Sequence, residues 1–268
     1  MSLFRYGRDF YADAAAQQLL SASAWLFVAL VGAFIAVHLL RRSTGHPVST
    51  MPAARLSPGV RIIRYEIGAR LYHWGNSLLV LALAVSGIAL FSPGLLGGAP
   101  WLLLHEVLAI LFMIGLALHV VVAPKRGEGR SMWFDAQDGR DLRVIAANFL
   151  GRSREYPAFG KYDPWQKIYH AFLTLLAAML VFSGMYLLLN TEAWMTFSHA
   201  WMRVMRVLHD VGAFAFVAIL LGHIYFGLIR ANWPQLVSIL TGRLRGSSFN
   251  RYHDAARWLP REEDGARR

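Results

Sequence analysis

The chain has 268 residues, of which 56% are hydrophobic and 16% are charged, and its mean hydropathy is +0.39. A soluble domain of this length carries a larger share of charge, so the composition predicts an integral membrane protein. The net charge of +11 comes from Lys and Arg between apolar runs, which is typical of cytoplasmic loops and argues against nucleic-acid binding. The absence of cysteine excludes disulfides, iron–sulfur ligation by this chain and covalently attached haem.

Five apolar runs are long enough to cross a bilayer as helices: about 22–40, 72–92, 101–123, 168–190 and 206–229. The first run ends in Arg41 and Arg42 and lacks a small-residue cleavage site, so we expect an uncleaved anchor rather than a signal peptide. Two shorter segments, 140–151 and 233–244, are either interfacial helices or plain loops.

Basic residues gather in three stretches, 41–70, 124–167 and the tail after 240, whereas the loops 93–100 and 191–205 carry little charge. The positive-inside rule assigns the basic stretches to the cytoplasm. With five spans, the N-terminus then lies outside and the C-terminus in the cytoplasm of a bacterial inner membrane.

An internal repeat connects the spans. Residues 71–91 resemble 168–188, because each stretch has Tyr-His near its start and Ser-Gly in its second half. The runs with His-Glu-Val and His-Asp-Val form a second repeated pair. We therefore predict an all-α integral membrane fold, a four-helix transmembrane bundle made by duplication plus one extra N-terminal helix.

This organisation predicts three regions. Residues 1–60 comprise an outer tail, the anchor helix and a basic linker. Residues 61–232 form the bundle, which membrane lipid surrounds, and residues 233–268 form a basic cytoplasmic tail.

Two pairs of histidines share a spacing of fourteen residues: His105 with His119, and His209 with His223. Fourteen helical residues span about 21 Å, the separation of two cofactors stacked across a hydrocarbon layer of about 30 Å. Histidines inside a membrane are costly and are usually functional, so we expect them to bind two b haems through iron. At the outer side only His105 and His209 are available as ligands.

The inner side has more histidines than one haem needs: His73, His119, His170 and His223 all fall there. Matched spacing alone favours His119 with His223. The residues leave this choice open.

Two glycines follow the repeated histidines at the same spacing. Gly87 lies fourteen residues after His73, and Gly184 fourteen after His170. We expect them to let a haem pack against the backbone. The alternative is helix–helix contact through small residues.

Several motifs together resemble one family: RYEIGARLYHW, LLHEV, GKYDPWQK, VLHDVGA and the tail RYHDAARWLPR. Over about 60–260 the chain resembles the cytochrome b (gamma) subunit of membrane-bound formate dehydrogenases. The Arg-x-x-His-Trp motif and the last-helix histidines are shared with cytochrome b subunits of nickel–iron hydrogenases. The Gly-Lys-Tyr loop and the tail are more particular to the formate dehydrogenase branch.

The resemblance implies an assignment for the inner site. It makes His73 and His223 the inner ligands, keeps His105 and His209 as the outer ones, and leaves the remaining two histidines as unassigned alternates. It also implies a quinone site, for menaquinone or ubiquinone, beside the inner haem.

The quinone loop is the segment 160–167, which includes Lys161. Asp163 and Trp165 depart from the family's Asn and Gly at these positions, which puts the shape of the pocket in doubt. Asp163 could relay protons to quinone or could cap the next helix.

The function implied is electron transfer rather than substrate chemistry. Electrons would pass from an iron–sulfur partner at the outer side to quinone at the cytoplasmic side, while a molybdenum or tungsten partner acts on the substrate. The alternatives are the cytochrome b of a hydrogenase, thiosulfate reductase or other molybdopterin enzyme, and a haem-free anchor or transporter. Near the outer ligands, Glu106 and Asp210 are expected to face the donor subunit or to contact Arg203 or Arg206.

Overall fold

The computed structural model describes residues 14–42, 48–49, 56–91, 100–125, 128–258 and 261–262. The outer tail before residue 14, nearly all of the loop 93–100 and the end of the basic tail lie outside the described residues. The expectations for these three segments stay predictions.

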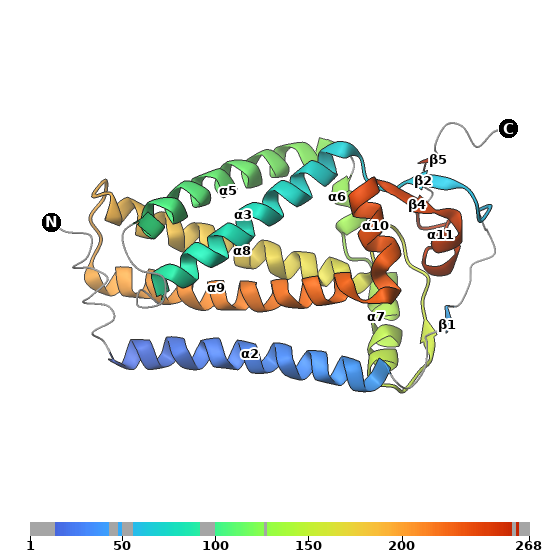
Figure 1. Ribbon diagram of the computed structural model, residues 1–268, viewed down its shortest axis with the longest axis horizontal. Coiled ribbons are helices and arrows are strands. Elements are labelled where there is room, and N and C mark those ends of the chain that lie inside the picture. The colour runs from blue at the N-terminus through green and yellow to red at the C-terminus, as the bar shows by residue number, and fades with distance from the viewer. Residues whose placement is uncertain are drawn as a thin grey trace. The chain divides into compact units, whose positions relative to one another are not determined.

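Five long helices dominate the chain (Figure 1): α2 (Ala14–Arg42), α3 (Ile67–Phe91), α5 (Pro100–Lys125), α8 (Pro164–Thr191) and α9 (His199–Leu228). Each contains a stretch long and apolar enough to span a membrane, which confirms the five predicted spans. In α5 none of that stretch is buried by the protein, as suits side chains that face lipid. The chain is an all-α integral membrane protein with several membrane passes.

The chain divides into two compact units. The first unit comprises Met1–Phe34, Leu78–Ile114 and Phe172–Gly222. The second comprises Ile35–Ser77, Gly115–Ala171 and His223–Arg268. All five long helices contribute residues to both units. The division into regions 1–60, 61–232 and 233–268 stays a prediction.

Both short amphipathic segments are helical. Helix α7 (Ala136–Phe149) begins with a capping box, in which Asp135 and Asp138 each accept the other's backbone N–H. Helix α10 (Trp233–Thr241) ends at Gly242, whose φ of 84° places it in the left-handed region. Of the two alternatives for these segments, the helices are therefore confirmed. Shorter helical pieces are α6 (Glu128–Met132), η1 (Arg230–Asn232) and α11 (Gly246–Tyr252).

A small β-sheet in the second unit was not predicted from the sequence. Strand β2 (Arg61–Ile63) pairs antiparallel with β4 (Arg243–Arg245) and β5 (Arg261–Glu262), beside α11 (Figure 1). Its core is Ile62, Leu244 and Phe249. A further pair, β1 (Val48–Ser49) with β3 (Glu155–Tyr156), is parallel. Strands of two or three residues are too short to produce a readable alternating pattern.

A close approach fixes the turn after β4. A Cβ on Gly246 would lie 2.2 Å from the carbonyl oxygen of Ser57, so only glycine fits there. The backbone N–H of Gly246 donates to the carbonyl of Val60 at 2.8 Å. The segment 243–258 is thereby held against residues 56–64.

A buried ion cluster connects α7, α8 and the C-terminal segment. Asp138 is fully buried and accepts from Lys167 Nζ at 2.7 Å and from Arg257 at 2.8 Å. Arg257 also donates to Asp141 at 2.5 Å. Buried charges are tolerated when several partners compensate them, and removing one partner is strongly destabilising. This cluster positions the start of α8 and hence the loop before it.

The N-terminal helix has its own contact in the second unit. The Nδ1 atom of His38 on α2 lies 2.8 Å from the hydroxyl of Tyr225 on α9. The His38 ring also packs against Phe149 and Phe226. The contact ties α2 to α9 at the level of His38.

Candidate functional site

Two histidines face each other in the first unit. His105 of α5 and His209 of α9 have ring centroids 6.2 Å apart and planes at 80°. Two imidazoles bound to opposite sides of one metal, with metal–nitrogen bonds of about 2 Å, have centroids about 6 Å apart. We call these residues the α5–α9 pair, and their separation fits two axial ligands of one iron.

Serines from the neighbouring helices contact both rings of this pair. The Oγ of Ser86 on α3 lies 2.8 Å from Nδ1 of His105. The Oγ of Ser183 on α8 lies 3.1 Å from Nδ1 of His209. Each Nδ1 therefore has a polar partner within the protein, which leaves Nε2 for a ligand.

The two predicted glycines lie against these same rings. A Cβ on Gly87 would lie 3.5 Å from Cε1 of His105, and a Cβ on Gly184 would lie 3.1 Å from Cε1 of His209. The structure thus brings each glycine next to an imidazole on the following helix. Whether a haem also packs against them stays a prediction.

A second facing pair lies in the other unit. His73 of α3 and His223 of α9 have ring centroids 6.4 Å apart, the separation that suits one iron, and their planes meet at 52°. Tyr169 of α8 stacks on His223 at 5.1 Å. We call His73 and His223 the α3–α9 pair. The family resemblance implied this pair for the inner site, whereas matched spacing favoured His119 with His223.

Buried polar atoms around the α3–α9 pair lack partners among the described residues. They are Nδ1 of His73, the hydroxyl of Tyr169 and Nε of Arg70. Buried polar groups are rarely left unsatisfied in native proteins. Together with the ring separation, the Tyr169 hydroxyl and the Arg70 Nε fit a site that holds a cofactor with polar groups.

The two remaining histidines are also in the second unit. The His119 ring stacks flat on Tyr72 of α3, with centroids 4.1 Å apart and planes at 10°. His170 of α8 is close enough to interact electrostatically with His119. The stack of Tyr72 on His119 in one half of the repeat is equivalent to the stack of Tyr169 on His223 in the other half.

The Arg-x-x-His-Trp motif has a structural meaning that the sequence did not reveal. Arg70 donates to the carbonyl of Leu240, and Nε1 of Trp74 donates to the carbonyl of Ile239 at 3.4 Å. Both carbonyls belong to the last turn of α10. The residues that flank His73 therefore hold the C-terminal end of α10.

The three predicted quinone residues of the loop 160–167 have different surroundings. Asp163 is buried and accepts from the backbone N–H of Trp165 at 2.6 Å and from the hydroxyl of Tyr156 at 2.5 Å. It thus caps α8, the alternative weighed against a proton relay. Burial raises the pKa of the Asp163 carboxyl. Lys161 Nζ lies over the ring of Tyr65 at 5.3 Å, and the Trp165 side chain is half exposed.

His253 is a fully buried residue that sequence reasoning missed. Its Nδ1 is 2.7 Å from the carbonyl of Gly160, and its Nε2 is 3.3 Å from a guanidinium nitrogen of Arg64. Arg64 also donates to the carbonyl of Lys161 at 3.0 Å. The two side chains fix the start of the loop 160–167. The only signal for His253 was its place in the tail motif RYHDAARWLPR.

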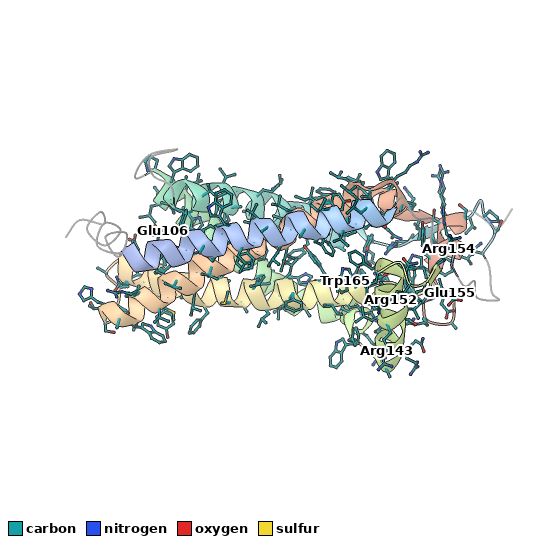
Figure 2. The ribbon with its side chains drawn as sticks, turned by 90° about the horizontal axis from the view of Figure 1, so that it is seen from below. Glu106, Arg143, Arg152, Arg154, Glu155 and Trp165 are labelled. Carbon is teal, nitrogen blue, oxygen red and sulfur yellow. The ribbon has the colours of Figure 1, made fainter. Side chains whose placement is uncertain are left out.

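Charged residues flank the α5–α9 pair. Asp210 accepts from Arg206 at 3.1 Å, one of the two partners expected for it. Glu106 lies on α5, one residue after His105 (Figure 2). Among the described residues no cluster of three or more His, Cys, Asp or Glu could hold a metal ion. Paired imidazoles supply two axial ligands, and a porphyrin supplies the other four.

A family model described as prokaryotic cytochrome b561 matches residues 64–242. The chain belongs to this family. It is a membrane b-type cytochrome of electron transfer, and the family implies b-type haem. The matched range contains both histidine pairs of this cytochrome, the loop 160–167 and α10. Among curated proteins no similar sequence was found.

The buried state of His253 predicts a pH dependence. Burial, followed by the charge of Arg64, lowers its pKa from 6.5 to about 3. The unfolded chain therefore binds the proton more readily, so stability is lost as pH falls from about 6.5 towards 3, at up to about 1.4 kcal/mol per pH unit. His253→Gln keeps a donor and an acceptor but cannot titrate, so its thermal midpoint should depend less steeply on pH.

The comparison of the two proteins in detergent isolates His253, because all other titrating groups are shared. Equal slopes for both proteins between pH 6.5 and 4 would contradict the assignment of a neutral, buried His253.

The glycines give a matched pair of variants. Gly184→Ala should push the His209 ring, because its Cβ would meet Cε1 at 3.1 Å, whereas Gly87→Ala makes ordinary contact at 3.5 Å. Overpacking costs about 1–3 kcal/mol, so we expect haem affinity at the α5–α9 pair to fall about tenfold in Gly184→Ala only. Haem content per purified chain measures this. Equal loss in both variants would instead indicate a haem packed against both glycines.

Proposed function

We propose that the chain is the diheme cytochrome b subunit of a respiratory oxidoreductase, most closely a membrane-bound formate dehydrogenase. The α5–α9 pair holds one b haem and the α3–α9 pair holds the other. The protein carries electrons between an iron–sulfur partner at the outer side and quinone near the cytoplasmic side. A molybdenum or tungsten partner performs the substrate chemistry.

One observation carries the proposal: two separate imidazole pairs with centroids 6.2 and 6.4 Å apart. Packing alone does not require two facing histidine pairs inside apolar helices, where each imidazole is costly. Each bound haem would supply a one-electron carrier. The paired imidazoles would hold the iron, and Ser86 and Ser183 orient the rings of the α5–α9 pair.

Charge supports the orientation with the C-terminus in the cytoplasm of a bacterial inner membrane. Arg143 of α7 and Arg152 and Arg154 in the segment after it are exposed (Figure 2). Exposed arginines beside an amphipathic helix suit the anionic cytoplasmic surface. The α3–α9 pair would then lie at the cytoplasmic side, because His73 lies in the second turn of α3, close to the basic stretch 41–70.

Three features of the second unit support quinone chemistry near the α3–α9 pair. Lys161 is a cation next to Tyr65 and Tyr162, and Trp165 exposes an aromatic face. The loop that contains them is fixed by Arg64 and His253. Asp163 serves as the cap of α8, so we assign the contact with quinone to Lys161 and Trp165.

The inner ligand set is tested by two substitutions. His73→Leu should remove one b haem, whereas His119→Leu should keep both, because it is His73 that faces His223. The reduced-minus-oxidised spectrum and the haem content of each purified variant decide. Loss of a haem in His119→Leu with retention in His73→Leu would reverse the assignment. His170→Leu is the control from the other half of the repeat.

The complex is tested with the chain and the subunits that copurify with it. Formate should reduce both b haems and, through them, a menaquinone or ubiquinone analogue. Reduction by hydrogen, or reoxidation by thiosulfate, would instead indicate the second candidate, a cytochrome b of another oxidoreductase. This second candidate is supported by the departures of the loop 160–167 from the formate dehydrogenase pattern at Asp163 and Trp165.

A further inference from the structure

The two serines that contact the α5–α9 pair occupy equivalent places in the duplicated helices. Ser86 on α3 precedes Gly87, and Ser183 on α8 precedes Gly184. Both serines are fully buried. Each reaches Nδ1 of a histidine on the helix that follows it in the chain, at 2.8 and 3.1 Å.

The direction of these hydrogen bonds follows from the chemistry of the partners. A neutral imidazole that binds iron through Nε2 carries its proton on Nδ1, so Nδ1–H donates to the serine oxygen. The serine hydroxyl then donates to a backbone carbonyl one turn earlier: Ala82 at 2.9 Å for Ser86, and Met179 at 2.8 Å for Ser183. Each histidine thus begins a chain of two hydrogen bonds that ends on a helix backbone, and the carbonyls of Leu83 and Leu180 lie beside the rings of His105 and His209 as further acceptors.

The α3–α9 pair differs in this respect. Nδ1 of His73 is buried and has no hydrogen-bond partner among the described residues. A hydrogen bond from Nδ1–H makes an imidazole a stronger electron donor through Nε2. Stronger donation stabilises ferric over ferrous iron and therefore lowers the reduction potential.

We propose that Ser86 and Ser183 lower the reduction potential of the haem at the α5–α9 pair below that of the haem at the α3–α9 pair. The serines act through the ligands and are positioning residues. This difference in reduction potential directs electrons from the haem at the α5–α9 pair to the haem at the α3–α9 pair. In the proposed function, this is the direction from an outer donor to quinone. The inference rests on the proposed diheme function.

Nearby charges do not replace the serines in this role. Arg206 and Asp210 flank the pair and form an ion pair with each other at 3.1 Å, and neither serine substitution removes either charge. The serine hydrogen bonds are uncharged and point directly at the ligands. Removing them changes the ligands without changing the net charge.

The test is potentiometry of the purified diheme protein followed by its optical spectrum. Ser86→Ala and Ser183→Ala should each raise the potential of one haem, and the double variant should shift its oxidised-to-reduced ratio about tenfold, or about 59 mV for a one-electron couple. The second haem should keep its potential. The control is Ser23→Ala on α2, whose hydroxyl donates to the carbonyl of Leu20 at 2.7 Å.

Unchanged potentials in the double variant, with both haems retained, would overturn the proposal, as would an equal shift in Ser23→Ala. If an alanine variant loses haem, Ser86→Cys and Ser183→Cys, whose side chains are close to serine in size and keep a weak acceptor, are measured instead. Unchanged potentials, or a shift equal to that of Ser23→Ala, would again overturn the proposal. Absence of b haem from the unsubstituted protein would contradict the diheme function instead, so the two failures are distinguishable.

Discussion

The ring nitrogens of an imidazole inside a bilayer can find partners only in the protein or in a bound cofactor, because lipid tails offer no hydrogen bond. In the α5–α9 pair, a serine hydroxyl contacts Nδ1 of each ring. Because the two rings face each other, Nε2 of each is left for a metal. Small residues make this possible: Gly184 leaves space at Cε1 of His209, where a Cβ would lie only 3.1 Å away, and Gly87 lies in the equivalent place beside His105. The duplicated Ser-Gly motif thus supplies a hydrogen-bond acceptor and space at adjacent positions.

Polar contacts in the second unit hold the segments around the α3–α9 pair in place. Arg70 and Trp74 fasten α10 to α3 on either side of His73, and His253 with Arg64 fixes the loop 160–167. The Asp138 cluster ties α7 and α8 to the C-terminal segment. These contacts make the basic tail part of the site's support.

The sequence predicted the long helices well, because a span of about twenty apolar residues has few other stable conformations. It predicted the facing of His105 and His209 from their depth alone. It did not choose between His73 and His119, because both have the required depth and only the helix packing that brings His73 opposite His223 distinguishes them. The β2–β4–β5 sheet and the buried His253 depend on contacts nearly two hundred residues apart, which no local pattern records.

The central claim is that one chain holds two haems, each between two histidines. The most direct measurement is haem b per purified chain, combined with electron paramagnetic resonance of the oxidised protein. The account predicts two haems per chain, both low-spin as expected of two imidazole ligands. One haem per chain, or a high-spin signal from a haem that lacks one axial histidine, would contradict it.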